Sequence, residues 1–147
     1  MATPAVHIVK LCVGISEPDE LAAWQKKRWN DAKKAGRKPE CRHITRNMPK
    51  RAAEIVEGGS LYWVIKGVIR VRQRIVDVKP CMHEGEPHCK LVLDRKLVRV
   101  MPRPMRAFQG WRYLEASSAP PDLDQLGKGA ANMPPRMVEE LRELGLL

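Results

Sequence analysis

The chain has 147 residues, of which 44% are hydrophobic and 30% charged, and its formal net charge is +10. These values are typical of one globular domain with a substantial core, and they argue against a disordered chain. No stretch approaches the roughly 18 apolar residues of a membrane span, and the first residues lack the pattern of a secretory signal. We therefore expect a cytoplasmic protein that does not bind membranes.

The positive charge is concentrated in two parts of the chain. Residues 26–51 carry eleven Lys or Arg against two acidic residues, and residues 62–113 carry twelve against four. The rest of the chain has a negative net charge. A segregated cationic surface attracts polyanions, above all RNA or DNA.

The first 57 residues predict alternating strands and helices. The predicted elements are a strand over 7–15, a helix over 16–35 with Ser16 as N-cap, a strand over 40–46 and a short helix over 48–57. Alternation in the first strand assigns one set of side chains to the core: His7, Val9, Leu11, Val13 and Ile15. Gly36 and Gly58 follow the two helices, where glycine commonly ends a helix.

Residues 61–79 carry the strongest strand signal, because they are rich in Val, Ile, Tyr and Trp. Gly67 interrupts the run and marks a bend, a bulge or the junction of two strands. Alternation gives an apolar face of Ile65, Ile69, Val71 and Ile75, with Gln73 among them, and a basic face of Lys66, Arg70, Arg72 and Arg74. Arginines about 6.5–7 Å apart suit the phosphates of an extended nucleic-acid strand. The alternative is an outer strand whose arginines are solvated or pair with carboxylates.

The remaining residues predict a hairpin partner, an arm and a last helix. In order, we expect a loop over 80–87, a strand over 88–100 that breaks near Asp94, a short aromatic strand over 108–114, a loosely packed arm over 116–135 and a C-terminal helix over 135–144. The fold class is therefore a single α+β domain over residues 1–147. It combines a curled, mostly antiparallel sheet with two helices in its N-terminal half and one at its C-terminus.

Aromatic and basic side chains near the central stretch are candidates for nucleic-acid contact. Tyr62 shares the face of the arginines, so Tyr62 and Tyr113 are candidates to stack on unpaired bases. Trp63 falls on the apolar face and is expected in the core. The other candidate contacts are Arg46, Lys50 and Arg51, which lie in the first basic segment.

The sequence carries few signals of catalysis or metal binding. His43 and Thr45 face the same way on their predicted strand and are candidates for a polar pocket that receives a base or a phosphate, with Lys66 nearby. No P-loop, dinucleotide fingerprint, nucleophile elbow or paired-carboxylate motif is visible, so we expect no cofactor and assign no catalytic residue. No pattern indicates an oligomeric state.

Four residues in and beside the predicted loop are chemically suited to zinc. They are Cys81, His83, His88 and Cys89. Their spacing is not that of a standard finger or ribbon, and adjacent His88 and Cys89 point to opposite sides of a strand. We therefore expect loop residues and no metal. The chain has four cysteines, which are expected to be free thiols in a cytoplasmic protein.

Several segments together resemble a known family. They are KLCVGI, DELAAWQ, HITRNMPKRAAEIVEGGSLYWVIKGVIRVRQRI, FQGWRYL and ELRELGLL. These segments are similar to a small alphaproteobacterial family of unknown function (domain of unknown function fourteen eighty-nine), which implies no known activity. A helix that ends in glycine before a curled run of strands is also similar in architecture to PUA-like and ASCH-like barrels, which bind RNA or modified bases. The G-x-K-x-x-E-x-R pattern of ASCH domains is not present.

Taken together, these features predict a nucleic-acid-binding protein, with RNA before DNA as its partner. Binding would use Lys66, Arg70, Arg72, Arg74 and the basic helix. Two alternatives stay open: an enzyme that acts on a nucleotide or modified base near His43, and a protein-interaction module for an acidic partner.

Overall fold

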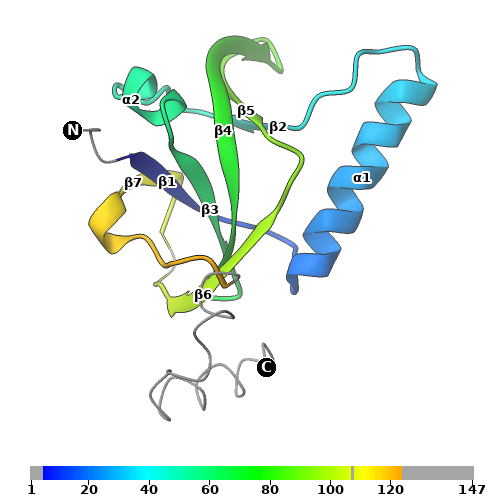
Figure 1. Ribbon diagram of the computed structural model, residues 1–147. Coiled ribbons are helices and arrows are strands. Elements are labelled where there is room, and N and C mark those ends of the chain that lie inside the picture. The colour runs from blue at the N-terminus through cyan, green and yellow to red at the C-terminus, as the bar shows by residue number, and fades with distance from the viewer. Residues whose placement is uncertain (1–4, 107, 124–147) are drawn as a thin grey trace.

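A long β-hairpin forms the centre of the molecule in the computed structural model, which describes residues 5–106 and 108–123 (Figure 1). Its strands are β3 (Ser60–Ile65) and β4 (Val68–His83), joined by a tight turn. Lys66 and Gly67 occupy that turn with positive φ angles of 50° and 77°. Two positive φ angles are the geometry of the hairpin turn whose twist matches that of the flanking strands. Gly67 therefore marks the junction of two strands.

The sheet has seven strands in the order β2-β5-β4-β3-β1-β7, with β6 paired to β4 off this path. The other strands are β1 (Val6–Leu11), β2 (Arg42–Thr45), β5 (Glu86–Leu93), β6 (Val98–Pro104) and β7 (Trp111–Glu115). β1 and β3 are parallel, and the remaining pairs are antiparallel. The protein is thus an α+β domain with a mostly antiparallel sheet.

β4 belongs to two parts of the sheet. Its first half pairs with β3 on one edge and β6 on the other. After a register shift at Val76, its second half pairs with β5, which in turn pairs with β2. The sheet curls at this point (Figure 1). Within the described residues its edge strands β2 and β7 do not pair, so the barrel suggested by the PUA-like resemblance is not closed.

Two core clusters lie on the two faces of β3, all six residues of which are buried. The larger cluster contains Val6, Ile8, Leu21, Ile55, Leu61, Trp63, Ile65, Val71, Ile75, Cys89, Leu91 and Leu93. The smaller contains Val9, Tyr62, Val64, Ile69, Val100 and Leu114. Trp63 is therefore a core residue, as predicted, and Tyr62 is one as well.

A buried amide attaches the first helix, α1 (Pro18–Lys34), to the sheet. Gln73 on β4 is fully buried, and it exchanges two hydrogen bonds of 2.8 and 2.9 Å with Gln25 of α1. Its Oε1 also accepts from Trp63 Nε1 at 3.0 Å, and its Nε2 donates to the Asp94 carbonyl at 3.0 Å. Because a buried amide is costly unless its groups are paired, this network fixes the position of α1.

The two predicted N-terminal helices are present but shorter. α1 begins at Pro18 with Glu17 as N-cap, so the prediction of Ser16 was wrong; Gly36 follows the helix with φ of 76°. The second helix, α2, spans only Ala52–Val56. The first strand ends at Leu11, and Val13 is 89% exposed, so its predicted place in the core was wrong.

The predicted loop over 80–87 is also corrected, because β4 continues to His83 and only Glu84 and Gly85 form the turn. Proline at position 80 is tolerated because the outer edge of β4 has no described partner strand beyond Ile75. The predicted break near Asp94 is present between β5 and β6.

The beginning of the predicted arm is packed on the sheet. A short 3₁₀ helix spans Ala116–Ser118, Pro120 is buried, and the Pro121 carbonyl accepts from Met101 N at 2.8 Å. The rest of the arm and the predicted C-terminal helix over 135–144 lie outside the described residues.

Candidate functional site

The predicted basic face of β4 is largely engaged in holding the fold together. Arg72 makes a bidentate ion pair with Asp122 at 2.7 and 2.8 Å, and it donates to Ser60 Oγ at 3.0 Å. The hydrogen bonds from Arg72 hold the pKa of the Asp122 carboxyl below its ordinary value. The guanidinium of Arg72 is therefore already occupied by a carboxylate.

Arg74 is engaged by backbone carbonyls at the end of α2. It donates to the Val56 carbonyl at 2.5 Å, to the Gly59 carbonyl at 2.8 Å and to the Ile75 carbonyl. Helix C-termini leave carbonyl groups unpaired, and a guanidinium that binds them stabilises the end of the helix. Arg74 therefore acts as a structural cap.

Arg70 lies at a β-bulge, so the expected regular row of arginines is interrupted. Trp63 pairs with Val71 and Val64 pairs with Ile69, which leaves Arg70 without a partner residue on β3. Ile69 and Val71 consequently belong to different core clusters, although alternation placed them on one face. The Nε of Arg70 is buried and unpaired within the described part of the chain. Lys66 is exposed in the hairpin turn.

The tyrosines offer little free ring surface. Tyr62 is 4% exposed and packs edge-on against His7 at 5.0 Å between ring centroids, so the expected base stacking on its ring is excluded. The hydroxyl of Tyr113 accepts from Arg51 N at 3.2 Å, and the Arg51 guanidinium lies 5.6 Å from its ring centroid.

The other basic candidates differ in how closely carboxylates engage them. Arg51 is held by Glu54 at 2.7 Å and by Glu115 at 2.9 Å. Arg46 is exposed and lies 3.9 Å from Glu86, and Lys50 is exposed.

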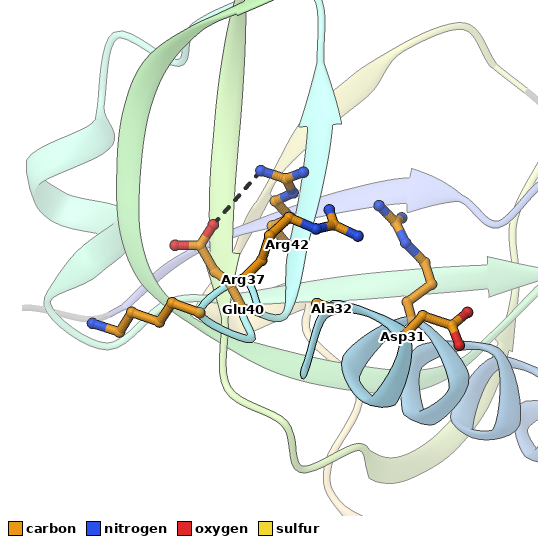
Figure 2. A pocket seen from close by; sticks show the side chains of 7 residues that line it. Asp31, Ala32, Arg37, Glu40 and Arg42 are labelled. Atoms are coloured by element: carbon orange, nitrogen blue, oxygen red, sulfur yellow. Dashed lines mark ion pairs between the residues drawn. The ribbon is translucent and has the colours of Figure 1, made fainter. Parts of the chain in front are cut away.

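Four exposed cations surround a depression of about 350 Å³ between the end of α1 and the start of β2 (Figure 2). They are Arg28, Arg37, Lys38 and Arg42. Asp31 and Glu40 also line it, and Figure 2 shows the ion pair between Arg42 and Glu40, which are 4.0 Å apart. We call this surface the basic depression. It carries a net positive charge, and it lies within the first basic segment of the sequence.

A second cavity measures about 600 Å³ and lies between β1, α1, β2 and residues 108–110. Three aromatic side chains are among its lining residues: Trp24 from α1, Trp63 from β3 and Phe108. We call it the aromatic pocket. His43 is among its lining residues, as the sequence suggested, but Thr45 is buried elsewhere and Lys66 does not line it. Lys10 provides the cation at this site instead.

Burial sets the protonation of the polar groups in the aromatic pocket. Burial, and then the charges of Lys10 and Arg28, lower the pKa of His43 to about 4, so its imidazole is neutral at pH 7. Its Nε2 is buried and has no hydrogen-bond partner among the described residues. Burial also lowers the pKa of Lys10 and raises that of the Cys12 thiol to about 11. A protonated thiol is a poor nucleophile.

The basic depression and the aromatic pocket adjoin each other along α1. A small hollow of about 20 Å³ lies between them and is lined by Trp24 and Arg28, which belong to the pocket and the depression respectively. The Arg28 guanidinium stacks over the Trp24 ring at 4.8 Å. These two residues are one helical turn apart, about 6 Å along the helix axis. The basic depression, this hollow and the aromatic pocket thus follow one another along α1, and we call the three together the groove.

The predicted zinc candidates do not converge. Cys89 is fully buried in the larger core cluster, and burial raises the pKa of its thiol to about 11. His83 and His88 lie edge-to-face at 5.2 Å between centroids on the exposed part of the hairpin. Within residues 5–106 and 108–123, no three His, Cys, Asp or Glu side chains are grouped to hold a metal ion.

Lys10, Trp24 and Phe108 line the pocket but were not predicted from the sequence. Trp24 is 47% exposed on α1. The usable signal was Arg28, four residues after Trp24, because that spacing stacks a guanidinium on an indole at the helix surface. Lys10 and Phe108 carried no local signal.

Comparison with known protein families decides the identity of the chain. The model of the family described as "Protein of unknown function (DUF1489)" matches residues 8–147. The chain belongs to this family. A search of curated proteins and of solved structures finds no significant match to this DUF1489 protein. Within its described residues, no helix is long and apolar enough to cross a membrane.

Proposed function

We propose that this DUF1489 protein binds single-stranded nucleic acid, RNA before DNA, in the groove between α1 and β2. The observation that carries the proposal is the basic depression, where four exposed cations surround one hollow. Guanidinium groups pair with phosphate bidentately, and the two acidic residues there leave the depression net positive. The groove replaces β4 as the proposed contact surface, because Arg72 and Arg74 are engaged within the protein.

A cytoplasmic location is part of the proposal. All four cysteines are described, and all are free thiols. Free thiols are typical of a reducing compartment, where RNA is abundant. The alphaproteobacterial source implied by the sequence resemblance is consistent with this setting.

Charge reversal tests the proposal. Arg37→Glu with Lys38→Glu changes two exposed residues of the basic depression, and we expect it to weaken binding of a labelled RNA of about 12 nucleotides by about tenfold or more at low salt. Fluorescence anisotropy measures the dissociation constant. The matched control is Arg99→Glu with Arg106→Glu, which changes the net charge equally at exposed positions outside the groove.

Two results would overturn nucleic-acid binding in this groove. One is an unmodified chain that fails to bind RNA in the micromolar range at low salt; the other is an equal loss in both double variants. Competition with polyglutamate tests the alternative that the partner is an acidic protein. If polyglutamate displaces RNA at equal charge concentration, the surface recognises charge alone and the RNA proposal fails.

A further inference from the structure

We propose that the aromatic pocket binds one planar nucleobase. In a bound RNA strand this would be a single unstacked base, and that part of the inference rests on the proposed function. The pocket itself is a separate site, with its own lining and its own chemistry.

The size and lining of the pocket suit a flat ring. Its volume of about 600 Å³ lies within the roughly 300–1,000 Å³ typical of ligand sites. Trp24 and Phe108 come from separate segments and are the aromatic rings with exposed surface at it, whereas Trp63 also lines it but is only 4% exposed. Aromatic side chains bind unpaired bases by stacking, because every base has a π-face.

The mouth of the pocket exposes apolar surface. Val13 is 89% exposed and Trp24 47% exposed, and both line the cavity. The two are the most exposed large hydrophobic residues at this end of α1. Apolar side chains left in solvent beside a formed cavity mark a place where a ligand is buried.

His43 provides the polar contact that a base would complete. Its ring stands edge-on to Trp63, with 5.0 Å between ring centroids. Its Nε2 is buried without a partner in the described residues, which is unfavourable for a polar atom. A neutral imidazole offers one donor and one acceptor, and the edge of a nucleobase presents both. Because Nε2 is buried, the imidazole would have to rotate for a base in the pocket to pair with this atom.

The positive charges around the pocket favour a nucleotide over an uncharged aromatic ligand. Lys10 lines the pocket, and Arg28 lies one helical turn beyond Trp24 at the edge of the basic depression. A ring in the pocket would thus have cations beside it on the side that leads to the depression. A nucleotide carries its phosphate next to its base, which matches this arrangement.

The four tryptophans of the chain provide a direct test. Trp24 and Trp63 line the aromatic pocket, whereas Trp29 and Trp111 do not. In protein labelled with 5-fluorotryptophan, each residue gives a separate ¹⁹F NMR signal, assigned with Trp→Phe variants. The probes are AMP and UMP, ribose 5-phosphate as a probe without a base, and benzoate as an aromatic acid without a base edge.

We expect AMP or UMP to shift the Trp24 and Trp63 signals and to leave Trp29 and Trp111 unchanged. Ribose 5-phosphate should shift neither pocket signal. Trp24→Leu should weaken nucleotide binding by about tenfold, as loss of one stacking partner predicts. The matched control is Trp29→Leu on the same helix, where the ring stacks with Arg95 at 3.9 Å outside the pocket. It should change the affinity by less than about twofold.

Three results would overturn the inference: no nucleotide shifts the pocket signals, benzoate binds as tightly as AMP, or Trp29→Leu weakens binding as much as Trp24→Leu. The test also separates this inference from the proposed function. If nucleotides bind but RNA does not, the pocket is a mononucleotide site and the proposed RNA binding in the groove is refuted. If RNA binds but the Trp24 and Trp63 signals do not shift, RNA binding stands and the inference about the pocket is refuted.

Discussion

His43 couples the protonation of the aromatic pocket to stability. Its pKa in the folded protein is lowered to about 4, chiefly by burial, from an ordinary value of 6.5. The folded state therefore binds fewer protons than the unfolded state between these values. The stability contributed by the neutral form is complete above about pH 6.5 and is lost as the pH falls towards 4.

We predict that His43→Gln reduces the loss of stability on acidification. Between about pH 7 and pH 5, unfolding of the unmodified protein in urea should lose about 1–2 kcal/mol through this imidazole. His7, whose pKa is lowered by burial and by Arg72 and Arg74, acts in the same direction and remains in the variant. Arg42→Gln, next to His43 on β2, is the control, because a guanidinium stays charged over this range. An unchanged pH dependence in His43→Gln would contradict the assignment.

Arg72 shows how a local pattern can hide a structural role. Its side chain is 25% exposed, that of Asp122 is 21% exposed, and their bidentate pair joins residues 50 positions apart. The pair also holds residues after the 3₁₀ helix against the sheet, next to the Val100–Asp122 bridge.

We predict that Asp122→Asn lowers the free energy of unfolding by about 1–3 kcal/mol, because it leaves a half-buried guanidinium without its counter-ion. Chemical denaturation measures the change. Glu86→Gln is the matched acid-to-amide control: its pair with Arg46 spans 3.9 Å with both side chains well exposed, so the expected cost is below about 0.5 kcal/mol. A cost for Asp122→Asn as small as that for Glu86→Gln would contradict a structural role of the Arg72–Asp122 pair.

At the scale of elements, two adjacent glycines after α2 differ sharply in their surroundings. A Cβ atom at Gly59 would lie 2.1 Å from the Val6 carbonyl oxygen and 2.6 Å from that of Ile55. A Cβ atom at Gly58 would meet only the Ala5 Cβ, at 3.6 Å. Gly59 thus allows α2 and β1 to approach the start of β3 closely.

We predict that Gly59→Ala destabilises the protein by more than about 3 kcal/mol, because backbone atoms rather than a flexible side chain must move. Gly58→Ala should stay within about 1 kcal/mol of the unmodified protein. Thermal unfolding of both variants gives the comparison. Similar midpoints for the two would show that the approach of α2 and β1 to β3 is not close.

Within β4, the alternation of apolar and polar residues was sufficient to predict burial but not the face of each side chain. Alternation along residues 68–75 correctly predicted which side chains are buried. It misassigned the face of Ile69, which lies just before the bulge at Arg70 and belongs to a different core cluster from Val71 and Ile75. It also placed Tyr62 with the exposed arginines, since alternation cannot reveal that β3 is covered on both faces.

At the scale of the whole molecule, segregated charge predicts a steep salt dependence. If the four cations of the basic depression contact phosphates, the logarithm of the RNA affinity should fall with the logarithm of salt concentration with a slope of about −3. Arg37→Gln with Lys38→Gln should reduce the slope to about −1.5, because two counter-ions fewer are released. Arg99→Gln with Arg106→Gln should leave the slope unchanged. A slope near zero in the unmodified chain would exclude phosphate contacts.

The sequence by itself determined the local properties of this protein. Apolar periodicity, β-branched residues and glycine punctuation specify the strands, the two helices and the α+β class, because these signals act over a few residues. The concentration of cations in residues 26–51 is likewise a property of the sequence. Membership of the DUF1489 family was also visible in the sequence alone.

Only the tertiary structure decided which cations are free and where a ligand can enter. Arg72 is neutralised by Asp122, and Arg74 by carbonyls that the sheet brings to it. The aromatic pocket combines Lys10, Trp24, His43, Trp63 and Phe108, which are far apart in sequence. Their convergence depends on strand order, on the bulges in β4 and on the curl of the sheet. These are long-range pairings, and no short stretch of sequence encodes them.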